Sequence, residues 1–197
     1  MPTCSSHGVS LGARRRQRAP ALLALVALLP GAAAGTVFET QEQALSRAFP
    51  APARVVRATS FLSPEQVESA RKAAQAPVDS AVVTRYAAFG PDGMLLGTAY
   101  FDSHVVRTAS EVLMIVVSPD RTIRSVDVLA FGEPQDYLPR AGWLKRAEGK
   151  RTEDGLFVGR ALAHVTGATM TTRAIAAAVR RVLAIHALLE PPAPPAK

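Results

Sequence analysis

Glycine and hydroxyl residues crowd the start of a strongly patterned helix near the C-terminus. The stretch "HVTGATMTTRAIAAAVRRVL" runs from His164 to Leu183. It contains four threonines: Thr166, Thr169, Thr171 and Thr172. Gly167 lets the backbone bend tightly beside them. Because a helix N-terminus presents free N–H groups and a partial positive charge, this turn suits an anion, and a phosphate in particular.

Helix capping is the alternative interpretation of the same residues. Thr171 or Thr172 would then be the N-cap of a helix that begins near these positions. Arg173 favours the anion, because a cation in the first helical turn opposes the helix dipole unless a negative charge lies nearby. No Gly-Lys-Ser/Thr sequence follows and the three-glycine spacing is absent, so the turn is neither a P-loop nor a dinucleotide fingerprint.

The histidines do not indicate a hydrolase, because none of them stands beside a recognisable nucleophile motif. We expect His104 to be a solvated strand residue and His186 to pack in the core. His164 lies just before the threonine turn and is a candidate hydrogen-bond partner of the anion.

The first 34 residues are typical of a secretory leader. A basic block of Arg14, Arg15, Arg16 and Arg18 precedes the apolar run "ALLALVALLP" and the small residues Ala32–Ala34. A membrane anchor is the alternative, because the uncharged run 19–35 is just short of the ~18–20 residues that span a bilayer. In either case the remaining chain is expected to be periplasmic or extracytoplasmic.

The charge of the chain gives little support to a nucleic-acid partner. The net charge is +7, but residues 1–34 hold four arginines and no acidic residue, so residues 35–197 carry only +3. These charges are mixed along the chain without a basic stripe. Cys4 is the single cysteine, and its removal with the leader would exclude disulfides and thiol catalysis.

Residues 35–79 are predicted to be a mainly helical segment. "TVFETQEQALSRAFP" is amphipathic and ends at Pro50, which favours a first helix. "APARVVRATSFL" is predicted to be a short extended segment. Ser63-Pro64-Glu65-Gln66 combines an N-cap, a proline at the first helical position and a glutamine at the third, and so predicts a second helix to about Gln75.

Residues 80–132 have the pattern of an antiparallel sheet. Four β-rich runs follow one another: "SAVVTRYAAFG", "MLLGTAYFDSHVV", "EVLMIVVSP" and "TIRSVDVLAFG". The turn signals "GPDG" and "SPDR" separate two pairs of them, and such short connections suit hairpins. The continuously apolar run from Val112 to Val117 predicts a central strand covered on both faces.

The chain becomes irregular after Glu133, with Trp143 and Leu144 as the expected anchors onto the core.

The last helix places one apolar stripe at helical spacing: Ile175, Val179, Val182, Leu183 and Leu189. Arg180 and Arg181 are expected on its solvated face, and Met114 and Met170 in packing positions. Residues 190–197 form a proline-rich tail. Together these elements predict an α+β fold in which helices flank one antiparallel sheet.

The C-terminal motif resembles that of the FMN-binding domain family. The family includes the C subunit of the sodium-pumping NADH:quinone oxidoreductase and the G subunit of the Rnf complex. Its members carry Asp-x-x-Ser/Thr-Gly-Ala-Thr, and "VTGATMTTRAIAAAVRRVL" is similar from Thr166 onward. The similarity extends upstream to "DSHVVRTASEVLMIVVSPDRTIRSVDVLAFGEP" and "GWLKRAEGK", so that it covers residues 80–189. The motif's leading acid is replaced by Ala163, and Asp154 is the nearest acid upstream.

This resemblance implies a covalent flavin. In the family a flavin transferase joins FMN through its phosphate to the last threonine of the motif, which is Thr169 here. The cofactor-binding residues that the resemblance implies are Thr166, Gly167, Ala168, Thr169, Thr171, Thr172, Glu111, Glu133 and Trp143. Glu111 and Glu133 are alternatively exposed strand-end charges. Trp143 is either a core residue or a stacking partner of the flavin.

The resulting hypothesis is an exported flavoprotein that carries electrons, and not a stand-alone enzyme. Its expected partners are the flavin transferase and a membrane or extracytoplasmic redox protein. No catalytic residue and no metal ligand are assigned, because the redox chemistry would belong to the flavin. The alternative is a non-redox extracytoplasmic binding module that keeps the fold without flavin attachment, and Ala163 is the residue that favours it.

Overall fold

The computed structural model describes residue 1 and residues 35–195. The leader predicted for residues 1–34 thus lies outside the described residues, except for its first position. From Gly35 onward the described residues belong to one compact unit. No helix in this part of the chain is long and apolar enough to cross a membrane.

One six-stranded antiparallel sheet forms the centre of the domain, in the order β1-β6-β5-β4-β3-β2. The strands are β1 Thr36–Val37, β2 Arg54–Phe61, β3 Val82–Phe89, β4 Leu95–Val106, β5 Ala109–Val117 and β6 Ile123–Phe131. The α+β class with an antiparallel sheet is therefore confirmed, and each of the four predicted β-rich runs forms one strand.

The predicted turn signals close two of the hairpins. In "GPDG" the Gly93 N–H donates to the Gly90 carbonyl at 2.9 Å, which turns β3 into β4. In "SPDR" the Arg121 N–H donates to the Ser118 carbonyl at 2.9 Å, which turns β5 into β6. Proline and aspartate at the centre of both turns favour these conformations over a helix.

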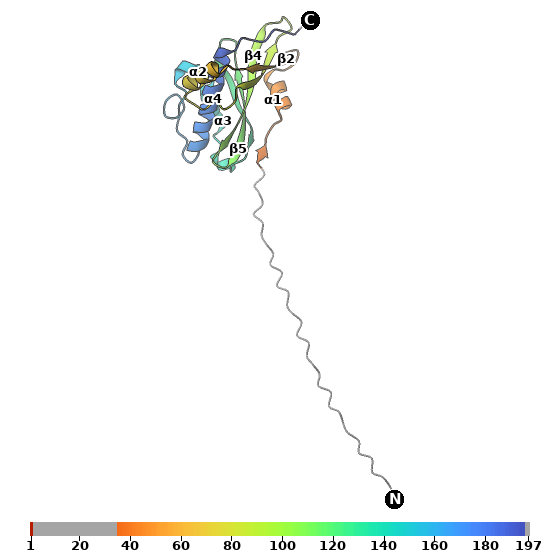
Figure 1. The fold of residues 1–197 in the computed structure, drawn as a ribbon, viewed down its shortest axis with the longest axis vertical. Helices are drawn as coiled ribbons and strands as arrows, with labels where there is room; N and C mark the ends of the chain where they lie inside the picture. Colours follow the sequence, from red (N-terminus) through yellow and green to blue (C-terminus); the bar gives the residue numbers. More distant parts are fainter. Residues whose placement is uncertain (2–34, 196–197) are drawn as a thin grey trace. The chain divides into compact units, whose positions relative to one another are not determined.

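Helices cover both faces of this sheet (Figure 1). The α-helices are α1 Gln41–Ala48, α2 Pro64–Ala74, α3 Ala141–Leu144 and α4 Thr169–Leu188, and short 3₁₀ helices span Gln135–Tyr137, Lys145–Ala147 and Thr152–Asp154. α2 and α4 pack against one face, with α4 lying across β4 and β5. α1 packs against the other face.

The N-terminal segment contains more strand than the sequence predicts. Residues 36–37 form β1, which pairs with β6, and residues 54–61 form β2, which pairs with β3. The first helix begins only at Gln41, because the Thr40 hydroxyl accepts from the Gln43 N–H at 3.2 Å and caps it. The second helix has the predicted capping box of Ser63 and Gln66 and ends at Ala74.

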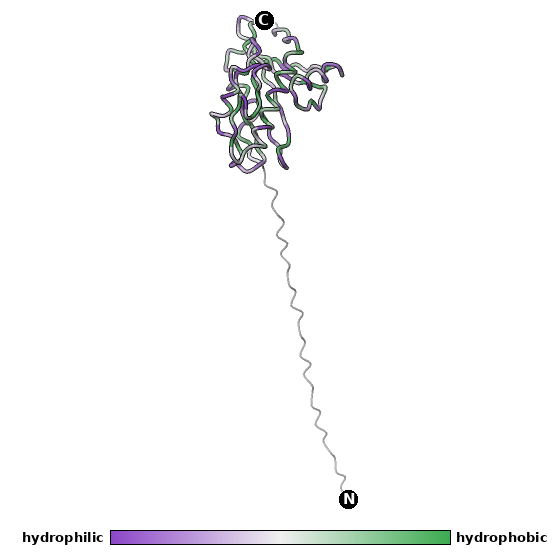
Figure 2. Tube along the Cα trace, turned by 90° about the vertical axis from the view of Figure 1, so that its left-hand side faces the viewer, coloured by the Kyte–Doolittle hydropathy of each residue, from purple (hydrophilic) through white to green (hydrophobic). Residues whose placement is uncertain are grey.

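Two apolar clusters sandwich the central strand β5. Leu113, Ile115 and Val117 face the cluster beneath α2 and α4. Met114 and Val116 face the cluster beneath α1. The run predicted to be covered on both faces is therefore buried from residue 113 to residue 117, with Val112 partly buried. Figure 2 shows hydrophobic stretches alternating with hydrophilic ones along the trace.

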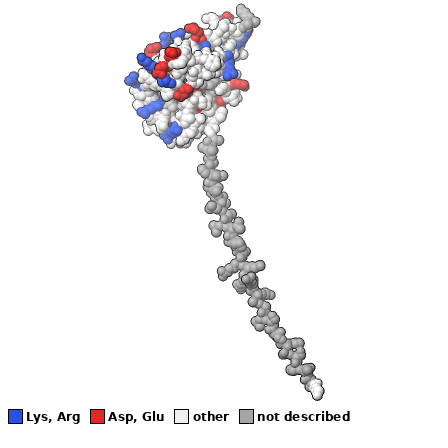
Figure 3. Space-filling model, viewed as in Figure 1, with Lys and Arg blue, Asp and Glu red and all other residues white. Residues whose placement is uncertain are grey.

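The long helix α4 supplies much of the larger cluster. Its predicted stripe is buried at Ile175, Val179, Val182 and Leu183, and Leu189 just beyond it is partly buried. Trp143 and Leu144 pack against the same cluster, as expected for the anchors of the irregular segment. Charges of both signs are interspersed over the face drawn in Figure 3.

Candidate functional site

The threonine turn leads directly into α4. The Ala168 N–H donates to the Val165 carbonyl at 3.2 Å, which closes a β-turn with Thr166 and Gly167 at its centre. Gly167 has φ +84°, and a Cβ built on it would meet nothing within 4 Å. The positive φ and not a shortage of space is therefore what requires glycine here. Thr166 and Gly167 are exposed, whereas Ala168 is buried.

α4 begins at Thr169, two residues before the predicted start. Its N-cap is Ala168, which has no side-chain oxygen, and no side chain of the described residues caps the helix. The first N–H groups of α4 are thus left for solvent or a ligand. Thr169 is only partly buried, so its hydroxyl lies beside these N–H groups at the accessible end of the helix.

Neither Thr171 nor Thr172 is the N-cap of α4 that the sequence predicts. Both are buried, with exposed fractions of 2% and 0%. The Thr172 hydroxyl donates to the carbonyls of Ala168 and Thr169 at 3.0 and 3.1 Å. Since α4 already includes both residues, neither is the N-cap, and the Thr172 hydroxyl is committed to the helix backbone instead of an anion.

Trp143 lies against the segment that leads into the turn. Its ring is 7% exposed, and Nε1 donates to the Ala163 carbonyl at 2.7 Å. Trp143 therefore belongs to the core, yet it also lines a hollow of about 670 Å³ beside Thr166. The other lining residues are Asp136, Leu138, Arg140, Gly142, Arg146, Ala163 and Val165. The hollow thus joins an aromatic side chain, two cations and the exposed turn.

Glu133 stabilises a hairpin and is not a free strand-end charge. Its Oε1 accepts from the Thr108 N–H and the Ala109 N–H, both at 3.0 Å, and from the Thr108 hydroxyl at 3.3 Å. The backbone hydrogen bond from Thr108 is the largest of the effects that lower the pKa of Glu133. None of these contacts reaches the threonine turn.

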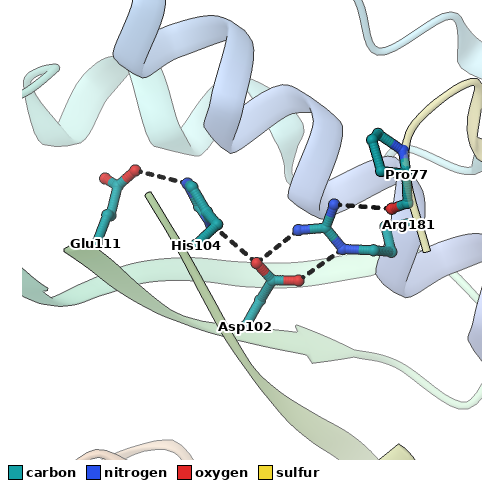
Figure 4. A network of polar contacts seen from close by, with 5 residues as sticks. All are labelled: Pro77, Asp102, His104, Glu111 and Arg181. Carbon is teal, nitrogen blue, oxygen red and sulfur yellow. Dashed lines mark hydrogen bonds and ion pairs between the residues drawn. The ribbon is translucent and has the colours of Figure 1, made fainter. Parts of the chain in front are cut away.

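Glu111 stands at one end of a chain of partly buried polar contacts (Figure 4). Its Oε2 lies 3.0 Å from His104 Nε2, and His104 Nδ1 lies 2.9 Å from Asp102 Oδ1. Asp102 then accepts two hydrogen bonds from the Arg181 guanidinium, at 2.9 and 2.7 Å. Glu111 is 0% exposed, so the prediction of an exposed charge is wrong.

The pKa values of these side chains follow from their burial and from the hydrogen bonds between them. Burial lowers the pKa of His104, but the hydrogen bonds with Asp102 and Glu111 outweigh it and raise that pKa to about 9. Burial opposes ionisation of Asp102, but the hydrogen bonds from His104 and Arg181 prevail and lower its pKa. For Glu111 burial prevails and raises the pKa.

Three side chains that were expected in solvent instead make hydrogen bonds or ion pairs within the domain. His104 and Arg181 belong to the chain just described, with side chains that are 15% and 16% exposed. Arg180 is 8% exposed and donates to the carbonyls of Ala74 and Leu156 at 2.7 and 2.8 Å. Its guanidinium also lies 3.9 Å from the centroid of the Phe157 ring.

The remaining histidines and methionines divide between core and surface. His186 Nδ1 lies 2.8 Å from the Tyr100 hydroxyl, as expected for a packed histidine, and burial lowers the pKa of His186 to about 4. Met114 is buried as predicted, whereas Met170 is 52% exposed, against the prediction. His164 is exposed and lies two positions before Thr166, so it stays a candidate hydrogen-bond partner of the anion.

The sequence analysis did not predict that Asp102 belongs to a polar network, although one signal was available. Tyr100, Asp102 and His104 alternate along a strand, so their side chains share one face of the sheet. Tyr100 is large and apolar enough to mark that face as the core face. Polar groups at the next two positions of a core face must find buried partners, and this would have pointed to a polar network.

No group of three or more His, Cys, Asp or Glu side chains that could hold a metal ion occurs within residue 1 and residues 35–195. Residues 109–184 match the family model of the FMN-binding domain. The matched range begins with β5 and ends within α4, and it contains both the threonine turn and Trp143. Neither a curated protein nor a solved structure matches the chain.

Proposed function

Because residues 109–184 belong to the FMN-binding domain family, we propose that this protein is an exported flavoprotein that carries electrons, with FMN joined through its phosphate to Thr169. Membership of the family makes the chain a flavin-binding protein. The covalent linkage, the export and the electron transfer are our inference. FMN would supply the redox chemistry when bound, and the residues of this chain would hold it.

The observation that carries the proposal is the partly exposed Thr169 at the first position of an uncapped 20-residue helix. A phosphate esterified to its hydroxyl would lie at the N–H groups that Ala168 leaves without a side-chain partner. The helix dipole favours an anion there, and Arg173 in the same turn is exposed and adds a positive charge.

The surroundings of the turn fit a flavin phosphate. Gly167 leaves open space above the turn, because even a Cβ at this position would meet no atom within 4 Å. The neighbouring hollow is lined by Trp143, by the cations Arg140 and Arg146, and by Asp136. An aromatic wall suits a planar ring system, and the cations suit a phosphate.

Attachment requires a second protein. We expect a flavin transferase to act on Thr169, and the exposure of Thr166 and Gly167 gives such an enzyme access to the turn. The basic, apolar and small segments of residues 1–34 support export to the periplasm or another extracytoplasmic compartment, by a cleaved leader or an anchor. The electrons would then pass between a membrane redox protein and an extracytoplasmic acceptor.

Intact mass measured after coproduction with a flavin transferase tests the linkage. We expect wild-type protein and Thr169→Ser to gain the mass of one FMN less one water and to remain yellow after denaturation. Thr169→Ala is expected to gain nothing, since it lacks the hydroxyl. Thr152→Ala, a threonine change outside the turn in the 3₁₀ helix Thr152–Asp154, should be loaded like wild type. Wild-type protein without the added mass would refute covalent attachment.

The second candidate is a non-redox extracytoplasmic binding module. Ala163 favours it, because the motif's leading acid is missing beside an otherwise complete Thr-Gly-Ala-Thr turn. In that case Thr169→Ala would change neither the absorbance of the protein nor its binding to a partner.

A further inference from the structure

The outer edge of β6 is open between two occupied ends. β1 and the residue after it cover one end as far as Leu129, whose carbonyl accepts from the Phe38 N–H at 2.8 Å. At the other end the Ile123 N–H donates to the Lys150 carbonyl at 2.9 Å. Residues 124–128 between them have no backbone partner on their outer side within the part of the chain that the structure describes. This stretch is about 17 Å long at the rise of a strand, and its outward N–H and C=O groups are left to solvent.

A groove of about 760 Å³ runs along this open stretch and is lined by residues 125–128 of β6. Gln43 and Arg47 of α1 line one side, and Ala141 and Leu144 of α3 line the other. α1 and α3 cover opposite faces of the sheet, because α1 packs on one apolar cluster and α3 on the other (Figure 1). The groove therefore follows the edge of the sheet and not one of its faces.

The lining of the groove selects an extended peptide as its occupant. Apolar side chains line it as well as the backbone: Phe38, Val126, Val128, Leu138, Pro139 and Leu144. Phe38 is 45% exposed although it is large and apolar, so this wall is not filled by the fold itself. Backbone groups covered by an apolar occupant need hydrogen-bond partners, and another extended chain offers N–H and C=O groups at the spacing of the strand. A helix pairs these groups within itself, and a lipid chain has none.

Charges beside the groove are complementary to a peptide that carries both signs. Lys145 and Glu148 line the groove and are exposed, and neither has an ion-pair partner among the described residues. On the opposite side Arg47 is already paired with Glu39 and Asp127, at 2.8 and 3.2 Å. The charges that await a partner thus lie beside α3, where an acid and a base of the occupant would meet them.

The groove shares a wall with the hollow beside the threonine turn. Leu138 lines both of them. The segment that starts with α3 presents Ala141, Leu144, Lys145 and Glu148 to the groove, and Gly142, Trp143 and Arg146 to the hollow. These two sets follow helical spacing, so they are two sides of one short helical segment. Such a segment is about 10 Å across, so an occupant of the groove would lie close to the hollow in which we seat the flavin.

We propose that the open edge of β6 is the docking site of the redox partner, which adds an extended segment of its own chain to the sheet as a further strand. The choice of a redox partner rests on the proposed function, whereas the open edge and its groove do not depend on the flavin. The added segment would be about four or five residues long, as the open stretch allows. It would place apolar side chains between an acid and a base, and it would contain no proline at the paired positions.

Two synthetic peptides with identical side chains test strand addition on flavin-free protein. Both have a valine-threonine-valine core between glutamate and lysine and have blocked ends, but one carries an N-methyl group on each core residue. We expect the unmethylated peptide to slow amide hydrogen exchange within residues 124–128 by about tenfold. It should also shift the fluorescence of Trp143, the single tryptophan of the chain. The methylated peptide should do neither, because it has no core N–H to donate.

Variants at the wall of the groove give matched controls. Ala141→Phe should abolish binding by filling the groove, whereas Ala73→Phe, at an exposed alanine of α2, should bind like wild type. Wild type should prefer one of two peptides in which the glutamate and the lysine exchange ends, by about fivefold. The double variant Lys145→Glu with Glu148→Lys should prefer the other.

Equal binding of the methylated and unmethylated peptides, or of Ala141→Phe and wild type, would overturn the docking site. Dimers in sedimentation that protect residues 124–128 without any peptide would also overturn it, because a second copy would then occupy the edge. None of these measurements needs a flavin. Failure of wild-type protein to take up FMN would therefore overturn the proposed function and the redox nature of the partner, and it would be a separate result from a failure of strand addition.

Discussion

Ala163 occupies the position at which the resemblance places an acid. Its carbonyl accepts a hydrogen bond from Trp143 Nε1, and the residue lines the hollow beside Thr166 and packs against the larger apolar cluster. We expect Ala163→Asp to raise the fraction of flavin-loaded protein after coproduction with a flavin transferase, because the family's enzyme would meet its complete motif.

Loading is measured as the fraction of molecules with the added mass of FMN. Ala161→Asp is the matched control, since Ala161 is a partly buried alanine of the same loop and should leave loading unchanged. Equal loading of wild type and Ala163→Asp would mean that the acid is not required in this chain.

The contacts of charged side chains could not be predicted where their partners lie far away in the sequence. Arg181 meets Asp102 across 79 positions, and Arg180 meets the Ala74 carbonyl across 106. Nothing in the local helical pattern distinguishes such residues from a solvated face. Glu111 likewise has the position of a strand-end charge, and only the pairing of β4 with β5 brings it to His104.

Local patterns, by contrast, predicted the elements well. The hairpin turns and the capping box of α2 depend on residues a few positions apart, and the structure has them as predicted. The start of α4 was misplaced because cap preferences favoured Thr171 or Thr172 over Ala168. Ala168 is the N-cap because the turn at Gly167 fixes the direction of the chain, and this leaves the helix end open for a ligand.

The turn before α4 can be tested through its glycine. Gly167 has φ +84°, and an alanine there would strain the backbone without a steric clash. We expect Gly167→Ala to lower the free energy of unfolding by about 1–2 kcal/mol, as measured by urea denaturation, and to reduce flavin loading. Gly142→Ala in α3 also meets nothing within 4 Å and has no positive φ. That control should be neutral or slightly stabilising, and equal losses in both variants would contradict a special role for the turn.

The partly buried chain of polar contacts from Glu111 to Arg181 ties the stability of the domain to pH. The folded-state pKa of His104 is raised from 6.5 to about 9, so its contribution is complete below the ordinary pKa and is lost as pH rises through 9. The raised pKa of Glu111 acts in the same direction, since the fold favours its protonated form. The lowered pKa of Asp102 acts oppositely, and its contribution is lost only as pH falls below about 4.

Stability should therefore be greatest in mildly acidic solution and decline toward alkaline pH. We expect the free energy of unfolding to fall on the order of 2–3 kcal/mol between about pH 6 and about pH 10, as measured by urea denaturation at each pH. His104→Gln should remove most of this decline, because glutamine cannot hold the proton. His164→Gln changes an exposed histidine that does not belong to these polar contacts, so this variant should retain the decline in stability. If both variants declined like wild type, the proton would not reside on His104, and the polar chain would stabilise the domain by packing alone.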